Sequence, residues 1–201
     1  MDRVITIGRE FGSGGREIGI KLAETLNIPF YDKELITLAA EAGGLDSSFI
    51  ENNEEGAHAL NGRAPGRISL ASFAYKPAFS DGIFYHQCDA IRSLAEKGPC
   101  VIVGRCADFV LKGESIDVFI AASMPFKIAR KRAMAPEKAD FTDQQMEKWI
   151  DEVNRARCRY YEHYTNQKWG NIQNYHLCVH SDLVGVDGAV HTIMAYLNAI
   201  R

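Results

Sequence analysis

Short apolar runs alternate along the chain with longer segments in which apolar residues recur at helical spacing. The short runs predict five strands, at residues 4–7, 28–31, 100–103, 118–121 and 177–179. The longer segments predict helices, at residues 17–26, 35–42, 83–94, 142–164 and 186–200. The run at 100–103 is apolar throughout, which is typical of a central strand in a parallel sheet. This order predicts an α/β domain with three layers around a parallel sheet of about five strands.

The first strand runs into a glycine-rich loop and then into a helix, through the sequence GREFGSGGRE at residues 8–17. Glycines let backbone N–H groups turn inward, and the helix N-terminus adds its own N–H groups and dipole, so this order predicts a phosphate site. The loop departs from the Walker A pattern G-x-x-x-x-G-K-[ST], because Gly15 stands at the lysine position and Arg9 at the first glycine. Arg16 is the nearest cation, and we expect it to replace the lysine in part. The predicted phosphate-binding residues are Gly12, Ser13, Gly14, Gly15, Arg16 and Glu17.

Two other interpretations of this loop stay open, an ordinary tight turn and a Rossmann dinucleotide site. Gly12 and Gly14, followed by Asp32, have roughly the spacing of the dinucleotide fingerprint. Against it, Glu17 stands at the third glycine position, and nine residues, 8–16, are expected to separate strand from helix. A loop of that length is better suited to wrap a phosphate than to make a tight turn.

Composition and charge narrow the possible function classes. The 201 residues, 46% hydrophobic and 24% charged, fit one globular domain. A net charge of −3 gives no indication of nucleic-acid binding, and no apolar stretch reaches the ~18 residues that span a membrane. The five cysteines contain no C-x-x-C pair and predict buried free thiols. We therefore expect a cytoplasmic protein with small-molecule partners, no nucleic acid and no membrane, and the oligomeric state stays open.

The chain resembles the cytidylate kinases, which are P-loop nucleoside monophosphate kinases, and above all a divergent cytidylate kinase-like group. The resemblance rests on the loop at 8–15, on Tyr31-Asp32, on Gly104-Arg105 and on the run at 160–170. It implies a P-loop NTPase-type fold in one domain, residues 1–201. Within it we expect a core at 1–44, 98–132 and 165–201, an acceptor-binding insertion at 45–97, and a lid with its helix at 133–164, in which the lid itself lies near 133–145.

Three positions depart from the cytidylate kinase pattern. Gly15 replaces the lysine, the sequence KEL at 33–35 replaces a Thr/Ser-Gly-Ala run, and GRC at 104–106 replaces Gly-Arg-Asp. Asp108 follows two places after this last segment. These departures leave phosphate binding supported and cytidine specificity unsupported.

The resemblance implies phosphoryl transfer from ATP, with Mg²⁺, to a small acceptor, above all a nucleoside monophosphate. Arginine side chains fit phosphate oxygens and stabilise the charge of phosphoryl transfer. The catalytic candidates are Arg16, Arg105, Arg130, Arg155 and Arg159. The candidates for acceptor binding are Asp32, Arg67 and Arg105, with Asp108 as an indirect magnesium ligand.

A non-catalytic protein that binds a nucleotide or a phosphorylated metabolite is the alternative function. It would keep the phosphate loop and would have lost the chemistry together with the lysine at position 15. Binding without transfer would distinguish this protein from a kinase.

Overall fold

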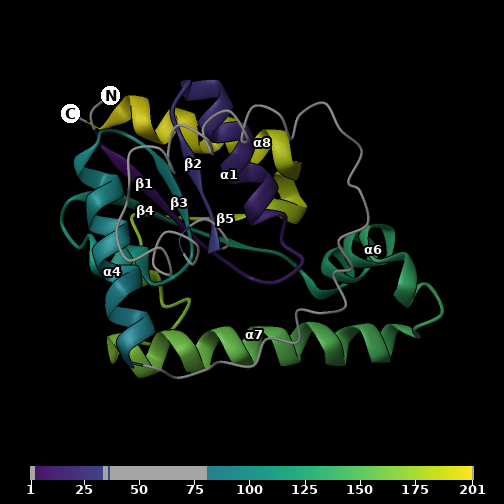
Figure 1. Cartoon of the computed structure of the whole chain (residues 1–201). Coiled ribbons are helices and arrows are strands. Elements are labelled where there is room, and N and C mark those ends of the chain that lie inside the picture. The colour runs from purple at the N-terminus through teal and green to yellow at the C-terminus, as the bar shows by residue number, and fades with distance from the viewer. Residues whose placement is uncertain (1–2, 34–35, 37–80, 201) are drawn as a thin grey trace.

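A computed structural model describes residues 3–33, 36 and 81–200, and its helices flank a single sheet (Figure 1). The strands are β1 (Val4–Arg9), β2 (Phe30–Tyr31), β3 (Val101–Val103), β4 (Ser115–Ala121) and β5 (Leu177–His180). The helices are α1 (Gly15–Leu26), α4 (Asp81–Glu96), α5 (Ala107–Val110), α6 (Met124–Met134), α7 (Asp143–Thr165) and α8 (Ser181–Ala199). Short 3₁₀ turns lie at Pro136–Lys138 and Ile172–Asn174.

The sheet has five parallel strands in the order β2-β3-β1-β4-β5, which confirms the predicted fold class. The first strand lies between β3 and β4, so Ile5 is paired with Val101 on one side and with Ile116 on the other. In the Rossmann order the first strand lies beside the second, so this topology excludes that alternative. Because all strands run the same way, the residues that follow them gather at one edge of the sheet.

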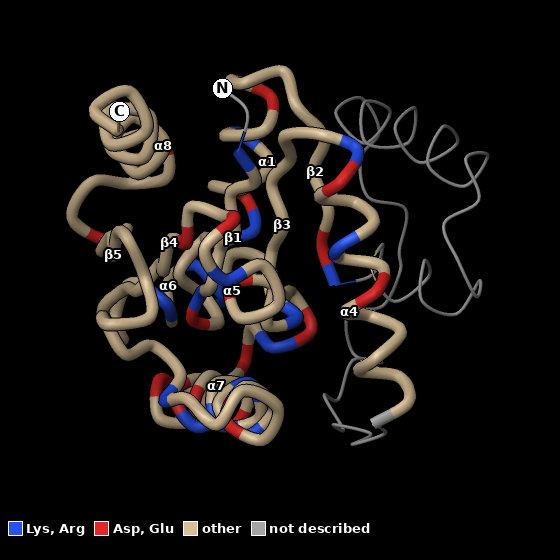
Figure 2. The backbone as a smooth tube through the Cα atoms, turned by 90° about the vertical axis from the view of Figure 1, so that its left-hand side faces the viewer, with Lys and Arg blue, Asp and Glu red and all other residues tan. Residues whose placement is uncertain are grey.

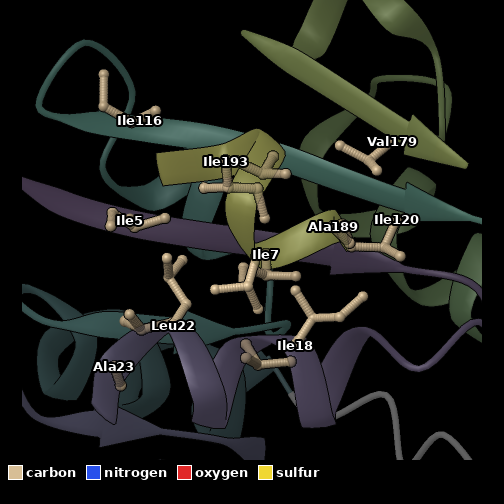
Figure 3. Close-up of a cluster of buried hydrophobic side chains, with 14 of the residues drawn as sticks. Ile5, Ile7, Ile18, Leu22, Ala23, Ile116, Ile120, Val179, Ala189 and Ile193 are labelled. Atoms are coloured by element: carbon tan, nitrogen blue, oxygen red, sulfur yellow. The ribbon is translucent and has the colours of Figure 1, made fainter. Parts of the chain in front are cut away.

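Alternating side chains of the strands pack against helices on both faces of the sheet. On one face, Ile7 of β1 packs in a buried cluster with Ile18 of α1 and Ile193 of α8 (Figure 3). On the other face, Ile102 of β3 packs with Ile91 of α4. This alternation is the period of two expected of strands covered on both sides.

Helix α7 lies apart from the two layers that cover the sheet and runs along one side of the molecule (Figure 1). It begins with a capping box between Thr142 and Gln145, which satisfies backbone donors of its first turn. Near its start, Met146 and Ile150 pack against Ile128 of α6. The sequence between the two helices is therefore held at both ends.

The predicted lid at 133–145 does not form a separate loop. It consists of the end of α6, the 3₁₀ turn Pro136–Lys138 and the first turn of α7. The Lys138 ammonium lies 4.8 Å from the centre of the Trp149 ring, and Arg132 donates to the carbonyl of Phe141 at 3.0 Å. Whether this segment moves on ligand binding stays a prediction.

Several predictions need correction or fall outside the description. Residues 45–80 of the predicted acceptor-binding insertion, including Arg67, lie outside the described residues, and most of the remainder forms α4. Helix α8 extends the predicted last helix back to Ser181, and the non-helical Gly185 separates a first helical turn from the stretch that begins at 186 as predicted. All five cysteines are free, and Cys88, Cys100 and Cys106 are buried as predicted, whereas Cys158 is half-buried and Cys178, on the edge strand β5, is exposed. No described helix is both long enough and apolar enough to cross a membrane.

Candidate functional site

The glycine-rich loop joins β1 to α1 through five residues, 10–14, and not through the nine that the sequence predicted. The difference arises because Arg9 still pairs with Ile120 of β4, and because α1 begins at Gly15. Gly12 and Gly14 have φ angles of +91° and +82°, a backbone conformation that other residues rarely adopt. The length of the loop therefore does not distinguish a phosphate loop from a Rossmann turn, whereas the strand order does.

Three hydrogen bonds hold the loop in place, one within it and two from helices α7 and α8. The hydroxyl of the fully buried Ser13 donates to the carbonyl of Glu10 at 2.9 Å. At the start of α8, the Ser181 hydroxyl lies 2.6 Å from the carbonyl of Ser13 and donates to it. From α7, the side-chain Oδ1 of Asn154 accepts a hydrogen bond from the backbone N–H of Phe11 at 2.7 Å. The loop is therefore fixed before any ligand arrives.

The N-terminus of α1 opens directly onto this loop. Its N-cap is Gly14, and no side chain caps the first turn. The first intrahelical hydrogen bond runs from the N–H of Ile18 to the carbonyl of Gly14 at 2.9 Å. The N–H groups that precede Ile18 are the donors with which a helix N-terminus binds an anion.

Helix α6 brings three cations to the loop, and Figure 2 shows the basic segments of the tube among β1, β4 and α6. A Cβ built on Gly12 would lie 2.9 Å from Cβ of Lys127, and one built on Gly14 would lie 3.4 Å from Cζ of Arg130. The Lys131 ammonium lies 3.9 Å from the centre of the Phe11 ring. Only glycine leaves room for α6 to pack this closely at position 12.

These cations crowd one another although two have acidic partners. Lys127 pairs with Glu10 at 3.1 Å, and Arg130 pairs with Glu17. Burial and then the neighbouring charges of Arg157 and Arg130 lower the pKa of Lys131 to about 8. An anion bound at the loop would reduce this repulsion, so the electrostatics favour a phosphate here.

Arg16 lies in the first turn of α1, and its side chain reaches the carboxyl end of β2. Its side chain is 54% exposed, and its Nε donates to Oδ2 of the buried Asp32 at 2.8 Å. The guanidinium carbon also lies 5.8 Å from the centre of the Phe30 ring. The structure brings two predicted site residues together, and the replacement of the missing lysine by Arg16 stays a prediction.

Arg105 follows β3 in an uncommon backbone conformation. Gly104, Arg105 and Cys106 have φ angles of +85°, +58° and +59°, and the last two are not glycines. Such a conformation costs free energy and is found mostly where the surrounding structure requires it, often at functional sites. The half-buried guanidinium of Arg105 lies 5.5 Å from the centre of the Tyr160 ring of α7.

Asp108 lies in the first turn of α5, behind Arg105. Its Oδ2 accepts a hydrogen bond from the Tyr161 hydroxyl at 2.7 Å, and burial raises the pKa of its carboxyl to about 6. Across the described residues, no group of three or more His, Cys, Asp or Glu side chains could hold a metal. An indirect magnesium role for Asp108 stays a prediction.

The predicted arginines of α7 lie on its exposed face. Arg155 and Arg159 are both exposed, whereas Asn154 and Arg157 face the body of the protein. Arg157 donates to the backbone carbonyl of Arg9 at 3.0 Å. Arg157, rather than Arg155 or Arg159, is therefore the α7 arginine that reaches the end of β1, and the catalytic roles of Arg155 and Arg159 stay predictions.

Spacing could have identified Arg157. The buried Met146 and Ile150 of α7, continued at steps of four and three, lead through Asn154 to Arg157 and Tyr161. That stripe turns toward the core. Lys127 and Lys131 of α6 gave a weaker signal, because their contacts with Gly12 and Phe11 depend on how α6 packs over the loop.

Solved structures share this fold. An uncharacterized protein from Eubacterium ventriosum is 28% identical, with a TM-score of 0.72, and the match covers 98% of this chain and 99% of that one. A shikimate kinase from Bacteroides thetaiotaomicron is 15% identical, with a TM-score of 0.56 and coverage of 98% and 99%. The YorR protein of Bacillus subtilis, in complex with phosphorylated GDP, is 13% identical, with a TM-score of 0.50 and coverage of 97% and 95%.

A comparison with curated proteins gives no match. The family comparison does give one, and it spans most of the chain, residues 4–183. The matched segment includes the glycine loop, Asp32, Gly104-Arg105 and all five strands. The chain therefore belongs to the cytidylate kinase-like family.

Proposed function

We propose that the protein transfers a phosphoryl group from ATP, with Mg²⁺, to a small acceptor, above all a nucleoside monophosphate. Family membership supports phosphoryl transfer in general. The observation that carries the proposal is the uncapped N-terminus of α1 beside Arg130 and Lys131. That combination of backbone donors and clustered cations suits a polyphosphate, because N–H groups and cations together can offset the negative charge of its oxygens.

The donor phosphates would lie over the loop at Gly12–Gly14. Backbone N–H groups of the loop and of the first turn of α1 would bind their oxygens, and Arg130 would approach from α6. Catalysis would then consist of positioning and charge neutralisation, since phosphoryl transfer needs little covalent help from the protein. Exclusion of water would prevent simple hydrolysis of the donor.

The acceptor would lie at the carboxyl ends of β2 and β3, beside Asp32 and Arg105. These side chains follow adjacent strands, so they reach the same part of the sheet edge. Arg105, from its constrained turn, would bind the acceptor phosphate or the transferred group. CMP need not be preferred, because residues 33–35 lack the Thr/Ser-Gly-Ala run of cytidylate kinases.

Mg²⁺ would arrive with the donor nucleotide. It is commonly held by one or two carboxylates together with substrate phosphates, and keeps several waters. Asp32 fits this use, since its carboxyl lies at the carboxyl end of β2. The ion would neutralise charge on the phosphates, and Asp32 would orient it through its bound water.

A transfer assay with a panel of acceptors tests the proposal. Wild-type protein is mixed with Mg²⁺ and ATP, and with CMP, UMP, AMP, GMP or shikimate, and products are followed by phosphorus NMR. We expect at least one nucleoside monophosphate to be phosphorylated faster than ATP is hydrolysed alone. An Arg130→Gln variant should lose this activity, and an Arg92→Gln variant, changed at an exposed residue of α4, should keep it.

Binding without transfer would instead support the alternative, a non-catalytic nucleotide-binding protein. The observation that favours it is Gly15 in place of the lysine. Thermal stabilisation by ATP or GTP, with no product from any acceptor, would identify that case. NAD(P) serves as a further control, and stabilisation by NAD(P) alone would contradict the kinase.

A further inference from the structure

Position 15, where a Walker sequence carries its lysine, is a glycine for a steric reason. A Cβ built on Gly15 would lie 2.5 Å from Cβ of Arg9 and 2.9 Å from its Cγ. Cβ atoms essentially never approach other atoms that closely. The atoms in the way form the root of the Arg9 side chain, so they could give way only if β1 or α1 moved. Arg9 therefore fills the space in which a lysine at position 15 would begin.

The far end of the Arg9 side chain also lies against a glycine. A Cβ built on Gly104 would meet Nη1 of Arg9 and would lie 3.0 Å from its Cζ and 3.2 Å from Nη2. Gly104 follows β3, which is the neighbour of β1 in the sheet. The side chain of Arg9 thus runs from the first turn of α1 to the carboxyl end of β3, with a glycine at each end to admit it.

The surroundings hold Arg9 at the end of β1 and draw the side chain of Arg16 toward the end of β2. Arg9 pairs with Ile120 of β4, and its backbone carbonyl accepts a hydrogen bond from Arg157 at 3.0 Å. Its half-buried side chain lies at the end of the central strand of the sheet. Arg16, in contrast, is 54% exposed and reaches Asp32 at the end of β2.

We propose that Arg9 supplies the phosphate-binding cation that a Walker lysine supplies elsewhere, and that Gly15 is a glycine in order to admit its side chain. Gly104, whose φ angle of +85° favours glycine in any case, leaves room for the guanidinium. The inference rests on the proposed function, because it assigns a role toward the same polyphosphate. A guanidinium in this position can chelate two phosphate oxygens, whereas an ammonium acts as a point charge. The Arg9 guanidinium lies between the glycine loop and the carboxyl end of β3, so it can contact the terminal phosphates of the donor.

Calorimetric titration of Arg9→Gln tests this assignment, with ATP, ADP, AMP and inorganic tripolyphosphate as probes. Loss of charge-assisted hydrogen bonds should weaken binding of ATP and tripolyphosphate by about 10- to 150-fold. The loss should be smaller for ADP and smallest for AMP, because fewer phosphates remain to be bound. Arg9→Lys should recover part of the affinity, and Arg92→Gln, the exposed control in α4, should bind as the wild type does.

A second variant covers the case in which Arg9→Gln does not fold. Gly15→Ala retains the arginine but forces the root of its side chain aside, and it should also weaken binding of ATP more than that of AMP. Unchanged binding of ATP by folded Arg9→Gln, or by Gly15→Ala, would overturn the assignment. So would a wild-type chain that binds neither ATP nor tripolyphosphate, or a loss of affinity in Arg16→Gln alone.

The same titrations separate this inference from the proposed function. Binding of ATP that depends on Arg9, in a protein that phosphorylates no acceptor, would leave Arg9 assigned and refute the transfer. Transfer at the wild-type rate in Arg9→Gln would support the kinase and refute the role of Arg9.

Discussion

Lys131 is the residue whose protonation reports most directly on an anion at the glycine loop. Burial and the charges of Arg157 and Arg130 lower its pKa to about 8, so the ammonium is partly deprotonated at mildly alkaline pH. A bound phosphate would raise this pKa again. Binding should therefore take up a proton near pH 8, and affinity for ATP should fall as the pH rises from about 7 to 9.

Calorimetry in buffers of different ionisation enthalpy measures this proton uptake. Lys131→Met keeps the apolar contact with Phe11 and should abolish the uptake, whereas Lys112→Met, at an exposed position, should not. Wild-type binding without proton exchange at pH 8 would place the phosphates away from Lys131.

Asp108 is a residue whose ionised form destabilises the fold. Burial raises its pKa from 3.8 to about 6, so the folded protein favours the neutral carboxyl. The cost is absent at pH values below the unfolded pKa and develops as the pH rises through the folded pKa. Asp108→Asn cannot ionise and still accepts the hydrogen bond of Tyr161, so it should be more stable than the wild type at pH 7, by on the order of 1–3 kcal/mol.

Urea denaturation at pH 4 and pH 7 checks the expected pH dependence. The gain should be much smaller at pH 4, which is close to the unfolded pKa of 3.8, because the wild-type carboxyl is then neutral in the folded state and only partly ionised in the unfolded state. A variant less stable than the wild type at pH 7 would contradict it. A stability gain with loss of phosphoryl transfer would indicate that the charge is kept for function.

At the scale of elements, the junction between β5 and α8 supports the glycine loop. The fully buried hydroxyl of Ser181 donates to the carbonyl of Ser13 at 2.6 Å and lies 3.2 Å from that of Ala121. Ser181→Ala leaves buried carbonyls without this donor, which costs about 1–3 kcal/mol. We expect an equal drop in the free energy of unfolding by urea, and weaker binding of ATP, because the loop is less well ordered.

Thr192→Ala on the same helix is the matched control. Its exposed hydroxyl donates only to the helix carbonyl of Gly188 at 2.8 Å, so the change should be within about 0.5 kcal/mol. Equal effects of the two variants would mean that Ser181 matters to α8 and not to the loop.

The sequence predicted the elements better than it predicted their ends and contacts. Buried strands such as β3 are recognisable because β-branched residues fill both faces of the sheet. The end of β1 was misplaced, since the pairing of Arg9 with Ile120 depends on a strand more than 100 residues away. Arg155 was preferred to Arg157 for a related reason: a one-sided arginine pattern on a helix does not say which side meets the protein.

At the scale of the whole molecule, the parallel order β2-β3-β1-β4-β5 explains why residues distant in sequence share one site. Asp32, Arg105 and Ser181 each follow a different strand, and parallel strands present their carboxyl ends at the same edge. Helices α6 and α7 then close that edge with Arg130 and Arg157, which contact the loop and β1. The strand order does not identify the acceptor, because residues 45–80 of the predicted acceptor-binding insertion lie outside the described residues.

Helix α6 connects the loop to the predicted lid, so ligand binding should protect the segment 133–145 from proteolysis. A phosphate at the loop would hold Lys131 and Arg130, and α6 continues directly into the turn that contains Lys138. The pair that bridges this turn, Arg132 of α6 with Asp143 of α7 at 2.7 Å, is exposed, and exposed pairs are weak. The segment should therefore open locally without ligand and close with it.

Limited trypsin digestion with mass spectrometry measures this closure at Lys138. At ligand concentrations of 100 times Kd, cleavage should slow by up to about 100-fold if opening requires release of the ligand. Lys97 and Lys112 are exposed and precede Gly98 and Gly113, so they serve as internal controls whose cleavage should not change. Suppose that ATP stabilises the protein to heat, but that Lys138 is cleaved at the same rate with and without ATP and acceptor. The site would then bind its ligand without closing.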